Sequence, residues 1–284
     1  MNLGNFYIVG ASIIWGLLPI YLKYLHYVPM TQLIGHRIFW SCLVLLGIIL
    51  LTGQWQKFCV AIATPRVWCL HFIAALLLGI NWLIFVWATN ANFLIETSLG
   101  YYMDPLVTIL IGVIFLCERM HPLQWISLGI AIFGVLYLTY ICGTFPWIAL
   151  TVAFTFGIYG AIKKITPLGA LYGLTLETII LFFPAMIYLV YVEIVGQGVF
   201  LHIDTVLSFL LVSAGLVTAI PLLMFASATK RISLFSVGFL QYLTPTVQFL
   251  LGVLIYKEPF LYSHLIGFSI IWVALIIFIK GGKS

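Results

Sequence analysis

Two stretches of equal length, 140 residues apart, decide the fold: PLVTILIGVIFLCE at 105–118 and PTVQFLLGVLIYKE at 245–258. Aligned without a gap, they share a proline at the start, a Gly-Val pair in the middle and a glutamate at the end. These matches are informative because proline, glycine and glutamate carry positional meaning, whereas leucine and valine match by chance in an apolar chain. The same offset, or one residue more, aligns further pairs: Phe85 with Phe225, Ala88-Thr89 with Ala228-Thr229, Gly16 with Gly157 and Lys23 with Lys164. The sequence therefore predicts an internal repeat.

The composition indicates where the chain resides. Of its 284 residues, 64% are hydrophobic and 7% charged, and the mean hydropathy is +1.22. Soluble domains average about 45–50% apolar and about 25% charged residues. So few charges cannot cover a water-soluble surface, which excludes a cytosolic enzyme, a nucleic-acid-binding domain and a disordered chain. The composition predicts a polytopic helical membrane protein whose partner is the lipid bilayer and not nucleic acid.

Ten apolar runs alternate with short breaks of charged and turn-forming residues. They lie at 5–22, 31–52, 67–90, 95–117, 123–142, 147–163, 170–192, 206–227, 234–256 and 262–279. A helix crosses the hydrocarbon core in about 20 residues. Each half holds five runs, and because five is odd, the second half enters the membrane from the opposite side. We therefore expect an all-α integral membrane protein with ten transmembrane helices, as a 5 + 5 inverted-topology repeat (1–143 and 144–284) around a central cavity, an architecture common in secondary transporters.

Lysine and arginine are distributed unevenly between the two sides of this arrangement. With the N-terminus inside, nine of the 12 lie in inner segments, two (Lys23 and Lys257) in outer segments and one, Arg37, within a span. Cytoplasmic loops carry such an excess of positive charge. We therefore expect both termini to face the cytoplasm.

Two ionisable residues lie well inside predicted spans near the outer side. A charge at the centre of a helix costs about 2.5–3.5 kcal/mol on insertion scales. Arg37 and Asp104, together with Asn81, lie roughly 9–13 Å below the outer ends of their spans, at a rise of about 1.5 Å per residue. The three residues thus share one layer, in which Arg37 and Asp104 can pair. The layer is either a polar site for a charged or zwitterionic solute or a structural salt bridge between two spans.

A third buried ionisable residue, Glu177, aligns with Arg37 in the repeat, which places it in the inner half. No basic residue is evident at its depth, and burial without a counter-ion favours the protonated carboxyl group. We therefore expect Glu177 to be a proton-coupling group. The alternative is a structural acid that hydrogen-bonds to a neighbour, for example Gln241.

Further residues complete the predicted substrate site. Several deep aromatic and amide side chains lie on spans that carry polar or broken positions, and the alternative for the aromatic ones is packing against lipid or core. The residues expected to bind substrate are Arg37, Asn81, Trp82, Tyr101, Asp104, Gln241 and Tyr242.

Three prolines lie inside spans near these positions: Pro105, Pro221 and Pro245. Each removes a backbone hydrogen bond and frees a carbonyl group. We expect them to act as hinges; a packing kink alone is the alternative.

Motifs typical of enzymes are missing from the sequence. The five cysteines form no C-x-x-C pair, the six histidines form no H-E-x-x-H, and there is no G-x-S-x-G, Walker loop or dinucleotide fingerprint. We therefore expect no catalytic residue, no metal site and no cofactor. Any driving force would be an ion gradient, or transport would be facilitated diffusion.

Five stretches carry a resemblance to a known family. They are Ile14-Trp15-Gly16, His36-Arg37-Ile38-Phe39-Trp40-Ser41, Asn81-Trp82 with Trp87-Ala88-Thr89-Asn90, SLGYYMDPL at 98–106 and QYLTPT at 241–246. Because they lie in both halves, nearly the whole chain resembles the EamA-type transporters of the drug/metabolite transporter superfamily. The resemblance implies ten helices, a central cavity and passage of a small metabolite or drug across the bacterial inner membrane. Members close to this chain usually carry asparagine at the position of Asp104, so the resemblance does not imply a negative charge there.

We therefore expect a secondary transporter, a permease for a small organic metabolite or drug-like solute, with efflux as the direction that the resemblance implies. Two other classes of protein are alternatives. A membrane-embedded lipid-modifying enzyme needs acids, histidines or phosphate-binding cations gathered at one membrane face. A structural or regulatory membrane protein needs no solute site at all. The sequence leaves the substrate and the oligomeric state open.

Overall fold

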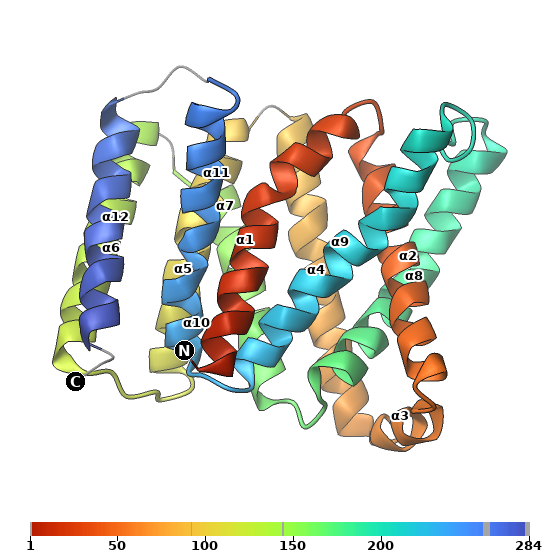
Figure 1. Ribbon diagram of the computed structural model, residues 1–284, viewed down its shortest axis with the longest axis horizontal. Coiled ribbons are helices and arrows are strands. Elements are labelled where there is room, and N and C mark those ends of the chain that lie inside the picture. Colours follow the sequence, from red (N-terminus) through yellow and green to blue (C-terminus); the bar gives the residue numbers. More distant parts are fainter. Residues whose placement is uncertain (1, 92, 144, 258–261, 282–284) are drawn as a thin grey trace.

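The protein is built from helices, and this computed structural model describes residues 2–91, 93–143, 145–257 and 262–281. The helices in chain order are α1 (Leu3–Tyr24), α2 (Met30–Leu51), α3 (Trp55–Ala61), α4 (Pro65–Asn90), α5 (Leu94–Ile114), α6 (Pro122–Cys142), α7 (Trp147–Ile165), α8 (Ala170–Ile194), α9 (Thr205–Thr229), α10 (Leu234–Gln241), α11 (Leu243–Leu254) and α12 (Tyr262–Gly281). The long helices run between two faces of the molecule, and α1 begins and α12 ends at the same face (Figure 1). We call this the inner face, following the orientation predicted from charge.

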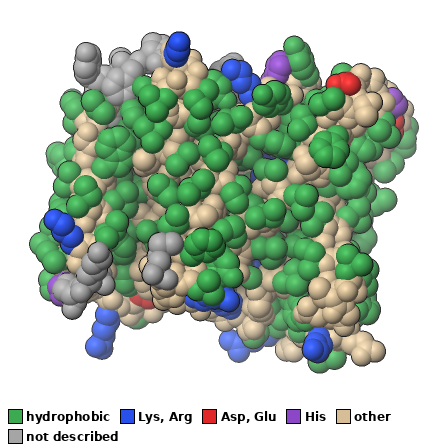
Figure 2. Space-filling view, viewed as in Figure 1, with side chains coloured by type: hydrophobic (Ala, Val, Ile, Leu, Met, Phe, Trp, Pro, Cys, Tyr) green, Lys and Arg blue, Asp and Glu red, His purple; other side chains and the backbone are tan. Residues whose placement is uncertain are grey.

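The surface of this bundle suits a membrane. Within the described residues, eight segments are long and apolar enough to cross a bilayer, and one of them combines α10 and α11. The described parts of α5 and α12 contain the shorter apolar stretches Leu99–Ile114 and Leu265–Gly281. Hydrophobic side chains cover the flank of the molecule, whereas Lys and Arg gather along the inner face (Figure 2). Because this flank is suited to hydrocarbon, the chain is an all-α integral membrane protein.

The helices follow the predicted apolar runs with two differences. The short helix α3 was not expected; its Phe58 is buried and packs edge-on against Tyr172, with ring centroids 5.7 Å apart. The predicted run 234–256 is divided at Tyr242, whose N–H bonds to the carbonyl group of Phe239 only three residues back. The division lies just before Pro245, which has no N–H for the helix ladder.

Helices of one half of the chain pack mainly on helices of the other half. The first helix, α1, packs on α9 and α11, and its counterpart α7 packs on α4 and α5. In the same way, α2 packs on α9 and its counterpart α8 packs on α4, while α2 and α8 pack on each other, as do α6 and α12. Exchanging each helix for its counterpart in the other half therefore reproduces the same pairs.

The two halves also share local backbone geometry at the ends of α5 and α11. Cys117 and Lys257, which are 140 residues apart, have left-handed backbone conformations with φ of 52° and 51°. In each helix the preceding residue donates its N–H to a carbonyl group five residues back, over 3.3 Å from Leu116 and 3.0 Å from Tyr256. Equivalent positions of the predicted repeat thus end their helices in the same way.

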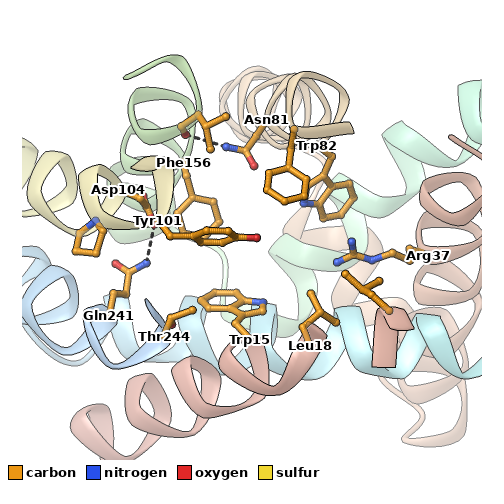
Figure 3. A pocket seen from close by; sticks show the side chains of 15 residues that line it. Trp15, Leu18, Arg37, Asn81, Trp82, Tyr101, Asp104, Phe156, Gln241 and Thr244 are labelled. Atoms are coloured by element: carbon orange, nitrogen blue, oxygen red, sulfur yellow. Dashed lines mark hydrogen bonds between the residues drawn. The ribbon is translucent and has the colours of Figure 1, made fainter. Parts of the chain in front are cut away.

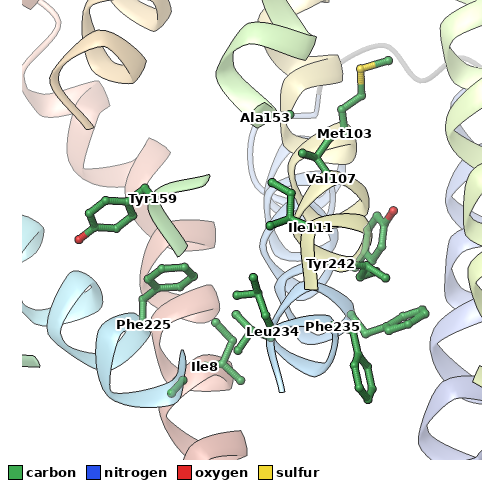
Figure 4. Packing of buried hydrophobic residues seen from close by; sticks show 14 of the residues in the cluster. Ile8, Met103, Val107, Ile111, Ala153, Tyr159, Phe225, Leu234, Phe235 and Tyr242 are labelled. Atoms are coloured by element: carbon green, nitrogen blue, oxygen red, sulfur yellow. The ribbon is translucent and has the colours of Figure 1, made fainter. Parts of the chain in front are cut away.

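The largest hydrophobic core joins helices of both halves of the chain. Ile8 of α1, Tyr159 of α7, Phe225 of α9 and Leu234 of α10 have no exposed surface and lie around one centre (Figure 4). The rings of Tyr159 and Phe225 stack, with centroids 6.1 Å apart and planes inclined by 13°. This core therefore holds the two halves together.

Candidate functional site

A cavity of about 150 Å³ lies between helices of both halves of the chain. Its walls come from α1, α2, α4, α5 and α7 and from the junction of α10 and α11. Polar side chains lie at two opposite ends, with aromatic side chains between them (Figure 3). Six of the seven residues expected to bind substrate line this cavity: Arg37, Asn81, Trp82, Tyr101, Asp104 and Gln241. A cavity of mixed apolar and polar lining between helices is a typical place for a small ligand.

The seventh expected residue, Tyr242, does not line the cavity, so this expectation is corrected. Its side chain is 1% exposed and belongs to the hydrophobic core. Successive residues of a helix point about 100° apart, because about 3.6 residues make one turn. With Gln241 facing the cavity, the side chain of Tyr242 is therefore turned away from it, into the core.

Five aromatic residues make the walls: Trp15, Trp82, Phe85, Tyr101 and Phe156. Phe156 meets Trp15 edge-on, with centroids 5.7 Å apart and planes at 81°. Phe85 meets Tyr101 at 5.8 Å and 70°. Edge-on pairs are a favoured packing geometry, so these rings hold one another in place around the cavity.

One end of the cavity is cationic. The Arg37 guanidinium donates from Nε to Oγ1 of Thr218 over 2.8 Å, and its Cζ lies 5.3 Å from the centre of the Trp82 ring. Neither Arg37 nor Asp104 takes part in an ion pair in the described part of the chain. The expected Arg37–Asp104 pair is therefore absent from this conformation, because the two side chains occupy opposite ends of the cavity (Figure 3).

The opposite end is formed by Asp104 of α5 and Gln241 of α10. The amide nitrogen of Gln241 donates to Asp104 Oδ2 over 3.3 Å. The other carboxylate oxygen, Oδ1, and the amide oxygen of Gln241 are buried with no hydrogen-bond partner among the described residues. Nearby, Thr244 donates to the carbonyl oxygen of Ser12 over 3.3 Å and so joins α11 to α1.

Asn81 lines the cavity and also joins two helices. Its amide nitrogen donates to the carbonyl oxygen of Val152 over 2.8 Å and to Thr155 Oγ1 over 3.0 Å. Both acceptors lie on α7, so the amide fixes α4 against α7. Its donors are thereby occupied, which leaves the carbonyl oxygen of Asn81 as the group available to a ligand.

Sequence reasoning missed several apolar members of the lining. Leu18, Leu22, Val152 and Phe156 all contribute to it. One signal was present: Phe156 follows Trp15 by 141 residues, the offset that aligns Gly157 with Gly16. The other three are ordinary apolar residues of apolar spans, which nothing in the pattern separates from lipid-facing ones.

The three predicted hinge prolines have different surroundings. Pro105 lines the cavity, yet α5 continues through it. Pro221 is buried inside the continuous helix α9. Pro245 follows the division between α10 and α11 and is also buried. Of the three positions, only Pro245 lies beside an interrupted helix.

The expectation that Glu177 lacks a basic partner is wrong. Its Oε1 accepts hydrogen bonds from Lys163 Nζ over 2.8 Å and from His71 Nδ1 over 2.7 Å, and its Oε2 accepts from the Tyr159 hydroxyl over 3.1 Å. Glu177 and His71 have no exposed surface, and Lys163 is 1% exposed. The other ring nitrogen of His71 lies 2.8 Å from the Thr166 hydroxyl. The premise for Glu177 as an unpaired proton-coupling group therefore fails.

These partners were missed because depth was judged from the position of each residue along its helix. Lys163 lies at the end of α7 and was assigned to an inner segment, but its long side chain extends back along the helix. Gly173 of α8 permits this: a β-carbon there would lie 2.7 Å from the His71 ring and 3.0 Å from Lys163 Nζ. The Lys163–Glu177–His71 cluster thus joins α7, α8 and α4 in the inner half.

A second polar cluster lies closer to the inner face. Glu118 accepts hydrogen bonds from the N–H groups of Leu234 and Phe235, over 2.8 Å and 3.0 Å, at the start of α10. Lys164 Nζ lies 3.2 Å from the same carboxylate and donates to the carbonyl oxygen of Ile232 over 2.6 Å. A carboxylate is stabilised at a helix N-terminus, where free N–H groups and the helix dipole favour negative charge.

Comparisons with known proteins identify similar sequences and a similar fold. The model of the EamA-like transporter family matches residues 2–140. The "Uncharacterized transporter YojE" of Bacillus subtilis is 41% identical over 97% of this chain and 93% of its own length. "Protein RarD" of Escherichia coli is 39% identical over 95% of this chain and 92% of its own length. One crystal structure of a protein covers 95% of this chain at 19% identity with a TM-score of 0.69, which shows a shared fold.

Proposed function

The chain belongs to the EamA-like transporter family and is a multi-pass transporter of the bacterial inner membrane, and we propose that it is a secondary transporter for a small amphiphilic organic anion or zwitterion. One observation carries this proposal: a cavity between the two halves has a cation, Arg37, at one end of an aromatic chamber, and no carboxylate of the described residues pairs with it. The aromatic walls suit the apolar body of such a solute, and Arg37 suits its anionic group.

The size of the cavity limits the apolar body of the solute. An apolar cavity of about 150 Å³ accommodates benzene. The cavity described here has this volume, so it fits a body of the size of one aromatic ring. Arg37 faces that space with guanidinium nitrogens that Thr218 does not occupy, because Thr218 accepts from Nε only. Two parallel N–H···O bonds from a guanidinium to a carboxylate are strong and specific.

For the topology, we propose ten membrane spans arranged as a 5 + 5 inverted repeat, with repeats at 1–143 and 144–284 and both termini in the cytoplasm. The exchange of helix contacts between the halves and the matching ends of α5 and α11 support the repeat. The nine-to-two excess of Lys and Arg in inner segments supports the orientation. A reporter fused after residue 143 is expected to lie in the periplasm and one fused after Ser284 in the cytoplasm. A periplasmic reporter at Ser284 would contradict this topology.

We propose that the two polar clusters close the inner side of the pathway in this conformation. The first joins Lys163, Glu177 and His71, and the second joins Glu118 and Lys164. In this proposal Glu177 helps to close the pathway, and both clusters must separate before a solute can pass the inner side. We propose efflux as the direction of transport, supported by the resemblance to EamA-type transporters.

A lipid-modifying enzyme is less well supported by the structure. The Lys163–Glu177–His71 cluster holds the groups that such an enzyme uses, but it has almost no exposed surface. A lipid headgroup therefore has no access to it. A purely structural role would not explain why the protein has an aromatic cavity with polar ends.

The solute class is tested with benzoate and its neutral counterpart benzamide. Purified protein in detergent is expected to melt at a higher temperature with benzoate, and much less so with benzamide, because only benzoate offers a carboxylate to Arg37. In proteoliposomes, labelled benzoate is expected to show counterflow. Arg37→Gln is expected to abolish both effects, whereas Lys57→Gln, at an exposed position on α3, leaves them unchanged. Equal effects of benzamide and benzoate would contradict the assignment of an anionic solute.

A further inference from the structure

At the polar end of the cavity opposite Arg37, two prolines each leave out one backbone hydrogen bond of a helix. Pro245 has no N–H to bond the carbonyl oxygen of Gln241, and its repeat counterpart Pro105 has none for Tyr101. Gln241 is the last residue of α10, and α11 begins at Leu243. In secondary transporters, unwound helix carbonyls near the solute site coordinate coupling cations.

Two acceptor oxygens at this end, Asp104 Oδ1 and Gln241 Oε1, are buried without a hydrogen-bond partner among the described residues. The hydroxyl groups of Thr108 and Tyr242 are buried here as well. Gln241 is 3% exposed and Thr108 has no exposed surface. Gln241 is held beside the carboxylate by its bond to Oδ2, and Thr108 lies one turn further along α5. An ionised carboxylate and an amide oxygen only accept hydrogen bonds. The hydroxyl groups of Thr108 and Tyr242, which interact with Asp104, can donate to it but carry no positive charge.

No positive charge compensates Asp104 in the described part of the chain. It has no ion pair, and Arg37, which faces the same cavity from α2, lies at the far end (Figure 3). The other titratable groups that interact with it are Tyr101 on α5 and Tyr242 at the junction of α10 and α11. Neither brings a positive charge. A buried carboxylate of this kind calls for a cation.

We infer that Asp104, Gln241 and Thr108 bind a small monovalent cation, a proton or Na⁺, beside the solute cavity. The partnerless oxygens have almost no accessible surface. An organic ammonium group in the cavity therefore cannot reach them, whereas a proton or a bare ion needs only a small shift. The site holds one carboxylate and otherwise neutral oxygens, a set that matches a single positive charge. Its use in coupling rests on the proposed transport, but cation binding itself does not.

Binding is tested without any solute. The melting temperature of the purified protein is measured in NaCl, KCl and choline chloride at equal ionic strength, and over a pH series through neutrality. We expect either Na⁺ or protons to raise the melting temperature of the wild type and to have no such effect on Asp104→Asn, which keeps the shape and removes the charge. Thr108→Val is expected to weaken a response to Na⁺ by removing one oxygen.

The control is Glu193→Gln, because Glu193 is an exposed carboxylate, 53% accessible and paired with His202. It is expected to respond as the wild type does. A Na⁺ response that disappears in Asp104→Asn identifies Na⁺, and a pH response that disappears identifies the proton. Responses that are absent in the wild type, or equal in wild type and Asp104→Asn, overturn the inference.

A second measurement separates this inference from the proposed function. Benzoate counterflow with identical ions and pH on both sides needs no coupling cation. The folding of Asp104→Asn is checked by size-exclusion chromatography and by a cooperative melting transition, so a missing cation response in the folded variant supports the site. If the wild type shows no benzoate counterflow, the proposed solute class is contradicted. The measurement of cation binding by melting temperature stays valid in that case.

Discussion

Lys163 and Glu177 form an ion pair of 2.8 Å between Nζ and Oε1 in the inner half of the bundle, where neither side chain is more than 1% exposed. Removing one partner of a buried pair leaves the other charge uncompensated, at a cost of about 3–5 kcal/mol. The remaining bonds from His71 and Tyr159 satisfy Glu177, so the pair belongs to a complete network. We propose that this network holds the inner side closed.

Glu177→Leu is therefore expected to lower the free energy of unfolding by about 3–5 kcal/mol, because it leaves Lys163 buried without a counter-ion. The double variant Glu177→Leu/Lys163→Met is expected to lose less than the sum of the two single variants, since it removes both charges together. Denaturant unfolding in mixed micelles measures all three. Strictly additive losses would mean that the two residues act independently.

Close approach of α7 to α5 is expected to depend on Gly157. A β-carbon there would lie 2.9 Å from Ile111 Cδ1 and 3.2 Å from Val107 Cγ1. Gly157→Leu is therefore expected to lower stability by about 1–3 kcal/mol through overpacking. It is also expected to reduce transport, because α5 carries Asp104. The matched control is Gly129→Leu on α6, where a β-carbon meets nothing within 4 Å. An equal melting temperature of the two variants would contradict this role of Gly157.

The positions of the helices were predictable because lipid imposes long apolar runs, and the repeat register supplied a second, independent pattern. The same register would have found Phe156 from Trp15. Whether an apolar side chain faces the cavity, the core or lipid was harder to predict from the sequence, because apolar residues line all three environments in this chain. Tyr242 shows the consequence: it neighbours a residue of the site, but one step along a helix turns its side chain into the core.

The error at Glu177 has a different physical cause. Lys163 and His71 contact Glu177 from other helices. Both contacts depend on the length of these side chains and on the space that the small residue Gly173 leaves for them. Linear depth along a span places backbone atoms and says little about where a long cationic side chain ends. The pairing of Arg37 with Asp104 failed for the same reason, since equal depth does not make two residues neighbours across a cavity.

Lys230 gives the protein a predictable pH dependence outside the spans. It follows the last residue of α9, and burial lowers the pKa of its amine below the ordinary value of 10.5, with Lys163 and Lys164 lowering it further. The folded state then binds fewer protons than the unfolded state, so stability rises with pH from the folded pKa up to about 10.5. Lys230→Gln is expected to flatten the rise of melting temperature with alkaline pH. Lys57→Gln, exposed on α3, serves as control, and an unchanged pH profile in Lys230→Gln would contradict the assignment.

The orientation of Arg37 is expected to matter as much as its charge. Thr218 holds Nε, and the ring of Trp82 lies 5.3 Å from Cζ, so the remaining nitrogens are directed along the cavity. Lysine lacks the planar fork and cannot satisfy both contacts and a carboxylate. Arg37→Lys is therefore expected to bind benzoate at least about tenfold more weakly, the loss of about 1.4 kcal/mol.

Thr218→Val is the matching test of orientation without loss of charge. It removes the hydroxyl acceptor and keeps the branched shape. The guanidinium group is then more mobile before binding and loses more conformational entropy when benzoate binds. We expect a smaller loss of benzoate affinity than in Arg37→Lys, with a melting temperature in the absence of solute close to that of the wild type. Thr178→Val, at a buried hydroxyl on α8 that bonds within its own helix, is the control. If Arg37→Lys binds benzoate as well as the wild type does, charge alone is sufficient and the fixed geometry of Arg37 is not part of recognition.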